Sequence, residues 1–295
     1  MRELKLNLKP LIKKLEVFTR KNVFGEFTGE YVSVFKGGGL EFEGYRAYTI
    51  QDDANIIDWK ASLRAGTLLV RSLIEERNLE VFFLMDISNS MLFSSIPKLK
   101  CEYAAELVAT LSSAMIQAGD NVGMGLFNEN MVKTIPTKSG KRQYFLIVHT
   151  LSDPKFYGGN FDFINVLKFI TGYLKRNTLL IIVSDFIGLQ EEWDKYLKIA
   201  SHKFEIIGFM IEDPLDLTLP HNVGQVIIED PFSKKELLID PDTLREDYEA
   251  RARSKINKIR DVFTKSGSDL LELRTDEPFV TPIIRFFEKR KRAWR

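Results

Sequence analysis

The sequence predicts an α/β protein with a mostly parallel sheet and a small β-rich module at its N-terminus. From residue 79 onward, short apolar runs of strand length alternate with longer amphipathic segments, which is the pattern of repeated strand–helix–strand units. Before that point, strand-like runs are separated by glycines instead. We therefore expect an accessory module over residues 1–78, a main domain over 79–275 and a basic terminal helix over 276–295.

The accessory module begins with a charged segment. Apolar residues at helical spacing follow Pro10 and predict a helix over residues 1–24. Strand-like runs at 31–35 and 67–74 lie on either side of the triglycine 37–39. No Gly-Lys-Ser/Thr follows the triglycine at the spacing of a phosphate-binding loop, so we interpret it as a turn. We also expect Trp59, which lies between these runs, to pack against the main domain.

The main domain opens with a strand and a helix. Residues 80–86 are apolar almost throughout, as expected of a strand buried on both faces. The segment 98–118 has an apolar stripe at helical spacing and is followed by Gly119, a residue typical of helix ends. The remaining predicted elements are a hairpin (121–127 and 131–135), helices (141–151 and 161–175), a strand (179–184), a helix (191–202), a strand (205–211), a hairpin (225–228 and 236–239), a helix (243–265) and a strand (269–273).

Composition excludes several classes of protein. The 42 Lys and Arg residues balance 41 Asp and Glu, so no charge surplus favours nucleic acid or an anionic membrane. The longest apolar runs are far shorter than the roughly 18–20 residues that cross a bilayer, and the first residues lack the apolar stretch of a signal peptide. The single cysteine, Cys101, excludes an internal disulfide and a cysteine-rich zinc site. We expect a cytoplasmic protein; its oligomeric state stays open.

Polar side chains gather where two of the predicted strands end. Asp86, Ser88 and Ser90 follow the first strand of the main domain at alternate positions, which point to one side in an extended segment. Asp185 follows the strand at 179–184. Open α/β sheets place their ligands at the carboxyl ends of the strands. We therefore expect these four side chains to converge at one edge of the sheet.

Two carboxylates at such an edge need a positive charge between them. At a separation of about 4 Å and an effective dielectric constant near 20 they repel each other by about 4 kcal/mol. No Lys, Arg or His lies within either motif, whereas carboxylates and hydroxyls are the oxygen donors that Mg²⁺, Mn²⁺ and Ca²⁺ prefer. The pattern predicts a divalent-metal site. The alternative is structural: Asp86 ends a strand, and Ser88 or Ser90 caps a turn.

Asp86, Ser88 and Ser90, placed between an apolar strand and an amphipathic helix, resemble the metal-ion-dependent adhesion site of von Willebrand factor type A domains. The chain also resembles a bacterial and archaeal family known as domain of unknown function fifty-eight, whose members carry a glycine-rich signature ahead of an A-type domain. The segments that carry this second resemblance are residues 29–44, 46–48, 52–53, 57–62 and 64, together with 119–123 and 184–186.

The resemblance implies a doubly wound sheet whose metal site binds a partner protein and has no enzymatic role. In A-type domains the three residues of the first motif, a threonine from a later loop and an aspartate after a further strand surround the ion. Here Asp185 matches the aspartate and Asn160 stands where the threonine is usual, with Asp162 as a second-sphere acceptor; Asn160 can equally be an ordinary loop or cap residue. The implied cofactor is Mg²⁺, with Mn²⁺ or Ca²⁺ as alternatives. The implied partner offers an acidic group and is a MoxR-type AAA+ ATPase or a client of that ATPase.

The enzymatic alternative is a metal-dependent phosphohydrolase that uses Asp86 as its nucleophile. Such enzymes carry a second aspartate two residues further on, and this chain has Ser88 there, which removes the usual general acid. We interpret Cys101, among apolar neighbours on a helix, as a core thiol. Five basic residues and a tryptophan near the C-terminus, over residues 288–295, are consistent with an acidic partner, a membrane surface or a solvated helix end.

Overall fold

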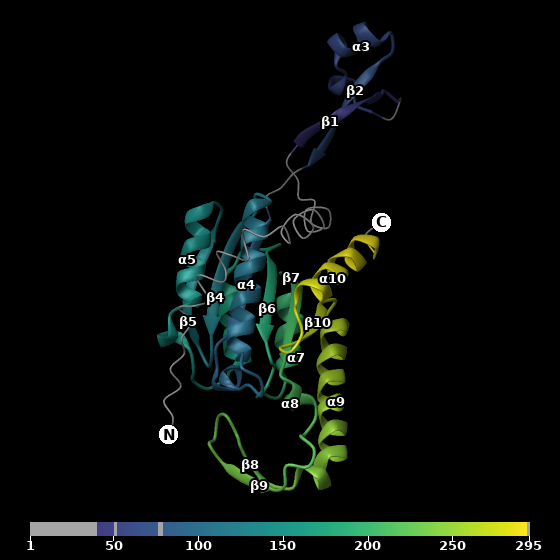
Figure 1. The fold of residues 1–295 in the computed structure, drawn as a ribbon. Coiled ribbons are helices and arrows are strands. Elements are labelled where there is room, and N and C mark those ends of the chain that lie inside the picture. Colours follow the sequence, from purple (N-terminus) through teal and green to yellow (C-terminus); the bar gives the residue numbers. More distant parts are fainter. Residues whose placement is uncertain (1–39, 50–51, 76–78, 294–295) are drawn as a thin grey trace.

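The computed structural model describes residues 40–49, 52–75 and 79–293 (Figure 1). The predicted helix over residues 1–24, the run at 31–35 and the triglycine 37–39 lie outside the described residues. No helix within the described part of the chain combines the length and the apolar composition needed to span a bilayer.

A six-stranded sheet forms the centre of the main domain, in the order β10-β7-β6-β3-β4-β5. All neighbours are parallel except β4 and β5, which form an antiparallel hairpin at one edge. The strands are β3 (Glu80–Asp86), β4 (Asn121–Phe127), β5 (Met131–Lys138), β6 (Leu179–Ser184), β7 (Glu205–Glu212) and β10 (Asp269–Arg274). The sequence analysis predicted each of these strands, and the ends differ by at most three residues.

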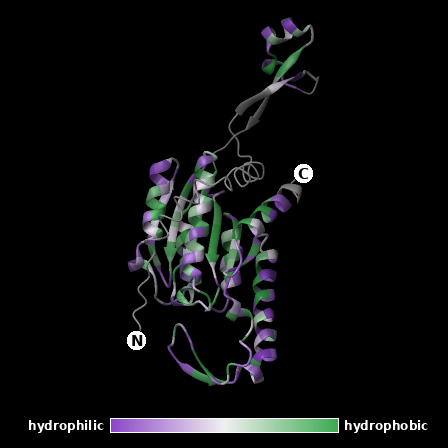
Figure 2. Cartoon of the chain, in the orientation of Figure 1, coloured by the Kyte–Doolittle hydropathy of each residue, from purple (hydrophilic) through white to green (hydrophobic). Residues whose placement is uncertain are grey.

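Helices cover both faces of this sheet, which makes it doubly wound. Successive side chains of β3 point to opposite faces: Phe83 belongs to one core cluster, whereas Phe82 and Leu84 belong to another. Burial of each such side chain stabilises the fold by roughly 1.5–3 kcal/mol. The first cluster includes residues of α4 (Lys100–Gln117), α5 (Lys141–Leu151) and α10 (Val280–Ala293); the second includes residues of α6 (Phe163–Tyr173), α7 (Trp193–Ser201) and α9 (Pro241–Lys265). In Figure 2 the central strands are coloured as hydrophobic, while the covering helices carry hydrophilic residues as well.

Short elements gather at the carboxyl ends of the parallel strands. The 3-10 turn η2 (Asn89–Leu92) follows β3, η3 (Pro154–Phe156) follows α5, and the one-turn helix α8 (Pro214–Leu217) follows β7. A separate hairpin of β8 (Val226–Glu229) and β9 (Glu236–Ile239) lies at the same end of the domain as α8 (Figure 1). Among the described residues, several short elements thus lie at this end of the sheet, as expected for a ligand-binding edge.

The N-terminal module pairs β1 (Leu40–Ala47) with β2 (Leu69–Glu75) in an antiparallel ladder. Between them lie the 3-10 turn η1 (Ala54–Ile56) and the helix α3 (Trp59–Ala65), which the sequence analysis did not predict. Asp58 caps α3 by accepting a hydrogen bond from the Ala61 amide, and Arg46 pairs with Asp52 at 2.6 Å. The expectation that Trp59 packs against the main domain is wrong, because this residue is 62% exposed.

Gly123 lets the edge strand β5 approach β4 closely. A Cβ at this position would lie 2.8 Å from the Ile135 carbonyl oxygen and 2.9 Å from the Thr137 amide nitrogen, both backbone atoms of β5. We expect Gly123→Ala to lower the free energy of unfolding by about 1–3 kcal/mol through overpacking. The control is Gly172→Ala in α6, where a Cβ meets no atom within 4 Å and alanine should stabilise by about 0.5–1 kcal/mol. Urea unfolding measures both; equal stability of the two variants would contradict the prediction.

Candidate metal site at the carboxyl end of the sheet

The candidate site lies where the sheet reverses its strand order. From β3 the chain first adds β4 and β5 on one side and then β6, β7 and β10 on the other. β3 and β6 are parallel neighbours with Met85 opposite Val183, so Asp86 and Ser184 leave the sheet side by side. Doubly wound sheets bind ligands at this point of reversal. The predicted convergence of the two strand ends is therefore present.

Asp86 is completely buried and both of its carboxylate oxygens accept hydrogen bonds. Oδ1 accepts from the Ser88 amide at 2.8 Å, and Oδ2 accepts from Ser184 Oγ at 2.6 Å. The Phe186 amide in turn donates to Ser184 Oγ at 2.9 Å. These contacts fix the Asp86 carboxylate relative to the turn that carries Asp185.

The two serines connect Asp86 to Asp185. The hydroxyls of Ser88 and Ser90 lie 3.2 Å apart, and Ser90 Oγ donates to Asp185 Oδ1 at 3.1 Å. Both serines are buried, and Asp185 is 5% exposed. Four of the five predicted site residues thus form one continuous polar cluster. The structural alternative holds in part, because Ser88 also precedes the 3-10 turn η2, although its side chain makes no capping hydrogen bond.

A lysine that the sequence analysis overlooked lies beside Asp185. Lys100, the first residue of α4, is completely buried, and its Nζ lies 2.7 Å from Asp185 Oδ2 and 3.0 Å from Asp216 Oδ2. Burial alone would lower the pKa of Lys100, but the two carboxylates outweigh it and the pKa rises. Lys100 lies outside both sequence motifs, so the motifs alone do not reveal this counter-charge of Asp185.

The short helix α8 holds this lysine and the loop before it. Asp213 accepts hydrogen bonds from Ser95, from the amide at 2.8 Å and from the hydroxyl at 2.5 Å. Asp216 accepts from the Asp213 amide at 2.9 Å as well as from Lys100. Because Ser95 lies in the connection between β3 and α4 and Lys100 is the first residue of α4, α8 braces the segment that follows the Asp86 motif.

Asn160 is exposed and makes no hydrogen bond with the other four predicted residues. The glycines before it are nevertheless tied to the site: the Gly159 amide donates to Asn89 Oδ1 at 3.0 Å, and the Gly158 amide donates to the Ile87 carbonyl at 2.7 Å. Asp162 accepts from the Asn165 amide at 2.9 Å and caps α6; its predicted outer-shell role at the ion stays a prediction.

The charge balance of the cluster leaves Asp86 without an ionic partner among the described residues. Burial, and then the charge of Asp185, raises the pKa of Asp86 to about 7, although hydrogen bonds from Ser184 and Ser88 oppose the shift. A cation near Asp86 would remove this penalty, and the donors at hand are hydroxyl and carboxylate oxygens, which suit a hard divalent ion. The residues therefore fit such an ion, although the described part of the chain contains no group of three or more His, Cys, Asp or Glu arranged to hold a metal.

The sheet order, the single antiparallel hairpin at the edge and the Asp-x-Ser-x-Ser motif at the point of reversal define a von Willebrand factor A-like domain. The chain belongs to the family described as protein of unknown function DUF58, whose model matches residues 44–258. Uncharacterized proteins of Mycobacterium tuberculosis and Mycobacterium bovis are 26% identical over 286 residues, which is 96% of this chain and 89% of theirs.

Among solved structures, BatB from Bacteroides thetaiotaomicron is similar at a TM-score of 0.49 and 17% identity, over 72% of this chain and 99% of that one. An aerotolerance-related membrane protein from Bacteroides fragilis gives a TM-score of 0.49 at 15% identity, over 73% and 99% of the two chains. A von Willebrand factor type A protein from Catenulispora acidiphila gives 0.31 at 14% identity, over 62% and 44%.

Proposed function

We propose that this protein is a non-enzymatic interaction module that binds an acidic group of a partner protein through a divalent cation. The observation that carries the proposal is the completely buried Asp86 carboxylate, which faces Asp185 and has no ion pair with any described residue. Mg²⁺ is the proposed ion, with Mn²⁺ or Ca²⁺ as alternatives, because all the available donors are oxygen atoms.

Each residue has a distinct proposed role. Asp86 supplies the negative charge, and Ser88 and Ser90 supply hydroxyl oxygens. Asp185, already neutralised by Lys100, positions the Ser90 hydroxyl through their hydrogen bond. Asn160 is exposed at the margin of the cluster, where its amide oxygen is available to the ion directly or through water. A bound ion would supply an open coordination position for a partner's carboxylate.

The geometry supports binding better than the phosphohydrolase alternative. Both Asp86 oxygens accept hydrogen bonds, from the Ser88 amide and the Ser184 hydroxyl, which fixes the carboxylate in place as a ligand for an ion would be fixed. Ser88 also stands where such an enzyme needs its general acid. These features favour a structural role for Asp86 in holding an ion.

The proposed partner is a MoxR-type AAA+ ATPase or a client of that ATPase, in an assembly or maturation step in the cytoplasm. This partner is what the resemblance to the family implies, and the argument is one of analogy. The candidate site itself supports only the chemistry of the proposed contact, in which the partner presents an acidic side chain to the bound cation.

Metal binding tests the proposal directly. We expect wild type to bind Mn²⁺, followed by electron paramagnetic resonance, and to gain about 2.7 kcal/mol of stability when Mg²⁺ is present at a hundred times its dissociation constant. Asp86→Asn should lose both effects. The control is Asp162→Asn, which changes the same residue type nearby and keeps an acceptable helix cap. Equal Mn²⁺ binding by wild type and Asp86→Asn would overturn the proposal.

A further inference from the structure

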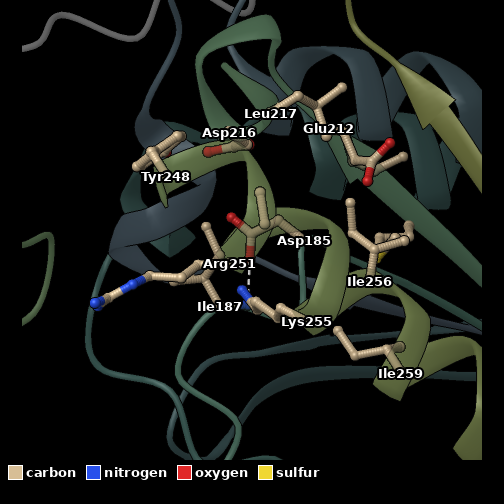
Figure 3. Close-up of a pocket in the computed structure, with 13 residues that line it drawn as sticks. Asp185, Ile187, Glu212, Asp216, Leu217, Tyr248, Arg251, Lys255, Ile256 and Ile259 are labelled. Carbon is tan, nitrogen blue, oxygen red and sulfur yellow. Dashed lines mark hydrogen bonds between the residues drawn. The ribbon is translucent and has the colours of Figure 1, made fainter. Parts of the chain in front are cut away.

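A pocket of about 400 Å³ opens beside Asp185, between the ends of β6 and β7, the helix α8 and the inner face of α9 (Figure 3). Its walls are largely aliphatic and come from Ile187, Met210, Leu217, Ile256 and Ile259. Its polar groups are carboxylates from the strand ends and from α8, together with a tyrosine and two basic residues from α9. An apolar pocket with a few charged groups is the usual form of a site that takes one elongated side chain or small ligand.

Glu212, the last residue of β7, supplies the buried charge of this pocket. The residue is only 7% exposed, and no described residue donates a hydrogen bond to its Oε1. Burial, followed by the charges of Glu272 and Asp216, raises the pKa of Glu212 to about 7. Burying a carboxylate oxygen that accepts no hydrogen bond lowers the stability of the folded protein. A glutamate at this position therefore calls for a functional explanation.

The other charged groups around the pocket do not satisfy Glu212. Asp185 and Asp216 are paired with Lys100. The guanidinium of Arg251 lies on the far side of the pocket from the Glu212 carboxylate (Figure 3). Lys255 is exposed and forms no ion pair within 4.0 Å with a described carboxylate. Glu212 is therefore a lining carboxylate with no ion pair within 4.0 Å among the described residues, although Arg274, Arg260 and Lys255 act on it at longer range.

We propose that this pocket receives a lysine or arginine side chain of a partner protein, with the aliphatic stem against the isoleucine walls and the cationic head at Glu212. The ligand chemistry is an alkyl chain with one cationic end. A free diamine shares that chemistry, but its second ammonium would lie at the side of the pocket that carries Arg251 and Lys255 and would be repelled there. The proposal goes beyond the ion site and does not depend on a bound metal.

The test uses the full chain labelled at isoleucine methyl groups, in EDTA, because Ile187, Ile256 and Ile259 report on the pocket. The probe is Nα-acetyl-lysine methylamide. We expect it to shift these signals in a saturable way, and we expect the Nε-acetylated analogue, which has the same stem without the charge, to bind about tenfold more weakly or worse.

Glu212→Gln keeps the shape of the side chain and should lower the affinity for the lysine probe by about tenfold or more. The control is Glu246→Gln on an exposed position of α9, which makes the same change in net charge and should leave the affinity as in wild type. The proposal is overturned if the neutral analogue binds as well as the charged probe, if Glu212→Gln binds like wild type, or if none of the three isoleucines responds.

Tighter binding of 1,5-diaminopentane than of the lysine probe would overturn the assignment to a protein side chain. Because every measurement is made in EDTA, failure of the ion proposal and failure of this one are distinguishable. Loss of Mn²⁺ binding would leave these shifts intact, and loss of the shifts would leave Mn²⁺ binding intact.

Discussion

Lys100→Met is expected to destabilise the protein by about 3–5 kcal/mol, because removing one partner of a buried ion pair leaves the other as an uncompensated charge. The side chains of Lys100 and Asp185 are 0% and 1% exposed, so water cannot replace the lost ammonium group. Methionine keeps most of the volume of the lysine stem, so the effect reports the charge and not a cavity. Urea unfolding at neutral pH measures it.

The matched control is Lys98→Met, two residues earlier on the same connection. Lys98 pairs with Glu106, and their side chains are 32% and 17% exposed, so we expect a cost of about 1 kcal/mol or less. If Lys100→Met cost no more than Lys98→Met, Lys100 would not be the counter-ion of Asp185. A destabilised Lys100→Met that binds Mn²⁺ more tightly than wild type would further indicate that the ammonium and the metal neutralise the same group of carboxylates.

The sequence predicts that Asp86 and Asp185 lie together at one edge of the sheet, but it does not predict that Lys100 joins them. The reason is physical. Asp86 and Asp185 each follow an apolar run, and parallel strands bring such positions to one edge whatever the rest of the chain does. Lys98 and Lys100 are both compatible with a solvated helix start. Only contact with Asp216, more than a hundred residues further along the chain, makes Lys100 a buried counter-ion.

The helix α3 is hard to predict from the sequence, whereas the position of Glu212 at the sheet edge is predictable. The helix α3 is only 7 residues long, and the two large apolar residues on its one apolar face, Trp59 and Leu63, are 62% and 85% exposed, so a pattern this short does not predict a packed helix. By contrast, Glu212 ends a third apolar strand of the same parallel sheet, as Asp86 ends the first. The same argument that placed Asp86 and Asp185 at the sheet edge therefore places Glu212 there as well, and only its lack of a hydrogen bond needed the structure.

Asp86→Asn is expected to make the metal-free protein more stable than wild type above pH 7, by up to about 4 kcal/mol. Burial, and then Asp185, raises the pKa of Asp86 to about 7 in the folded protein, whereas its value in the unfolded chain is the ordinary 3.8. The folded state therefore holds this proton more tightly, and its contribution to stability is fully present below about pH 4 and is lost as the pH rises through about 7.

Asparagine cannot ionise, so the variant should lack this part of the pH dependence. Its amide oxygen can accept the hydrogen bond from the Ser88 amide, and its NH₂ group can donate to the Ser184 hydroxyl, so the local contacts survive. Burial raises the pKa of Glu212 as well, so Glu212 also makes the free energy of unfolding fall as the pH rises, and it does so equally in wild type and in the variant. The difference between wild type and Asp86→Asn, measured by urea unfolding in EDTA from pH 5 to pH 8, therefore isolates Asp86.

Mg²⁺ should make the free energy of unfolding of wild type depend less on pH, because a bound cation favours the ionised carboxylate and replaces the proton. The pH dependence of Asp86→Asn should be the same with and without Mg²⁺. Asp162→Asn should follow wild type in both conditions. A variant that is less stable than wild type at pH 8 in EDTA, with an unchanged slope, would mean that Asp86 is already ionised and compensated without metal. The site would then have no free negative charge for a cation to neutralise, and the proposed mode of binding would fail with it.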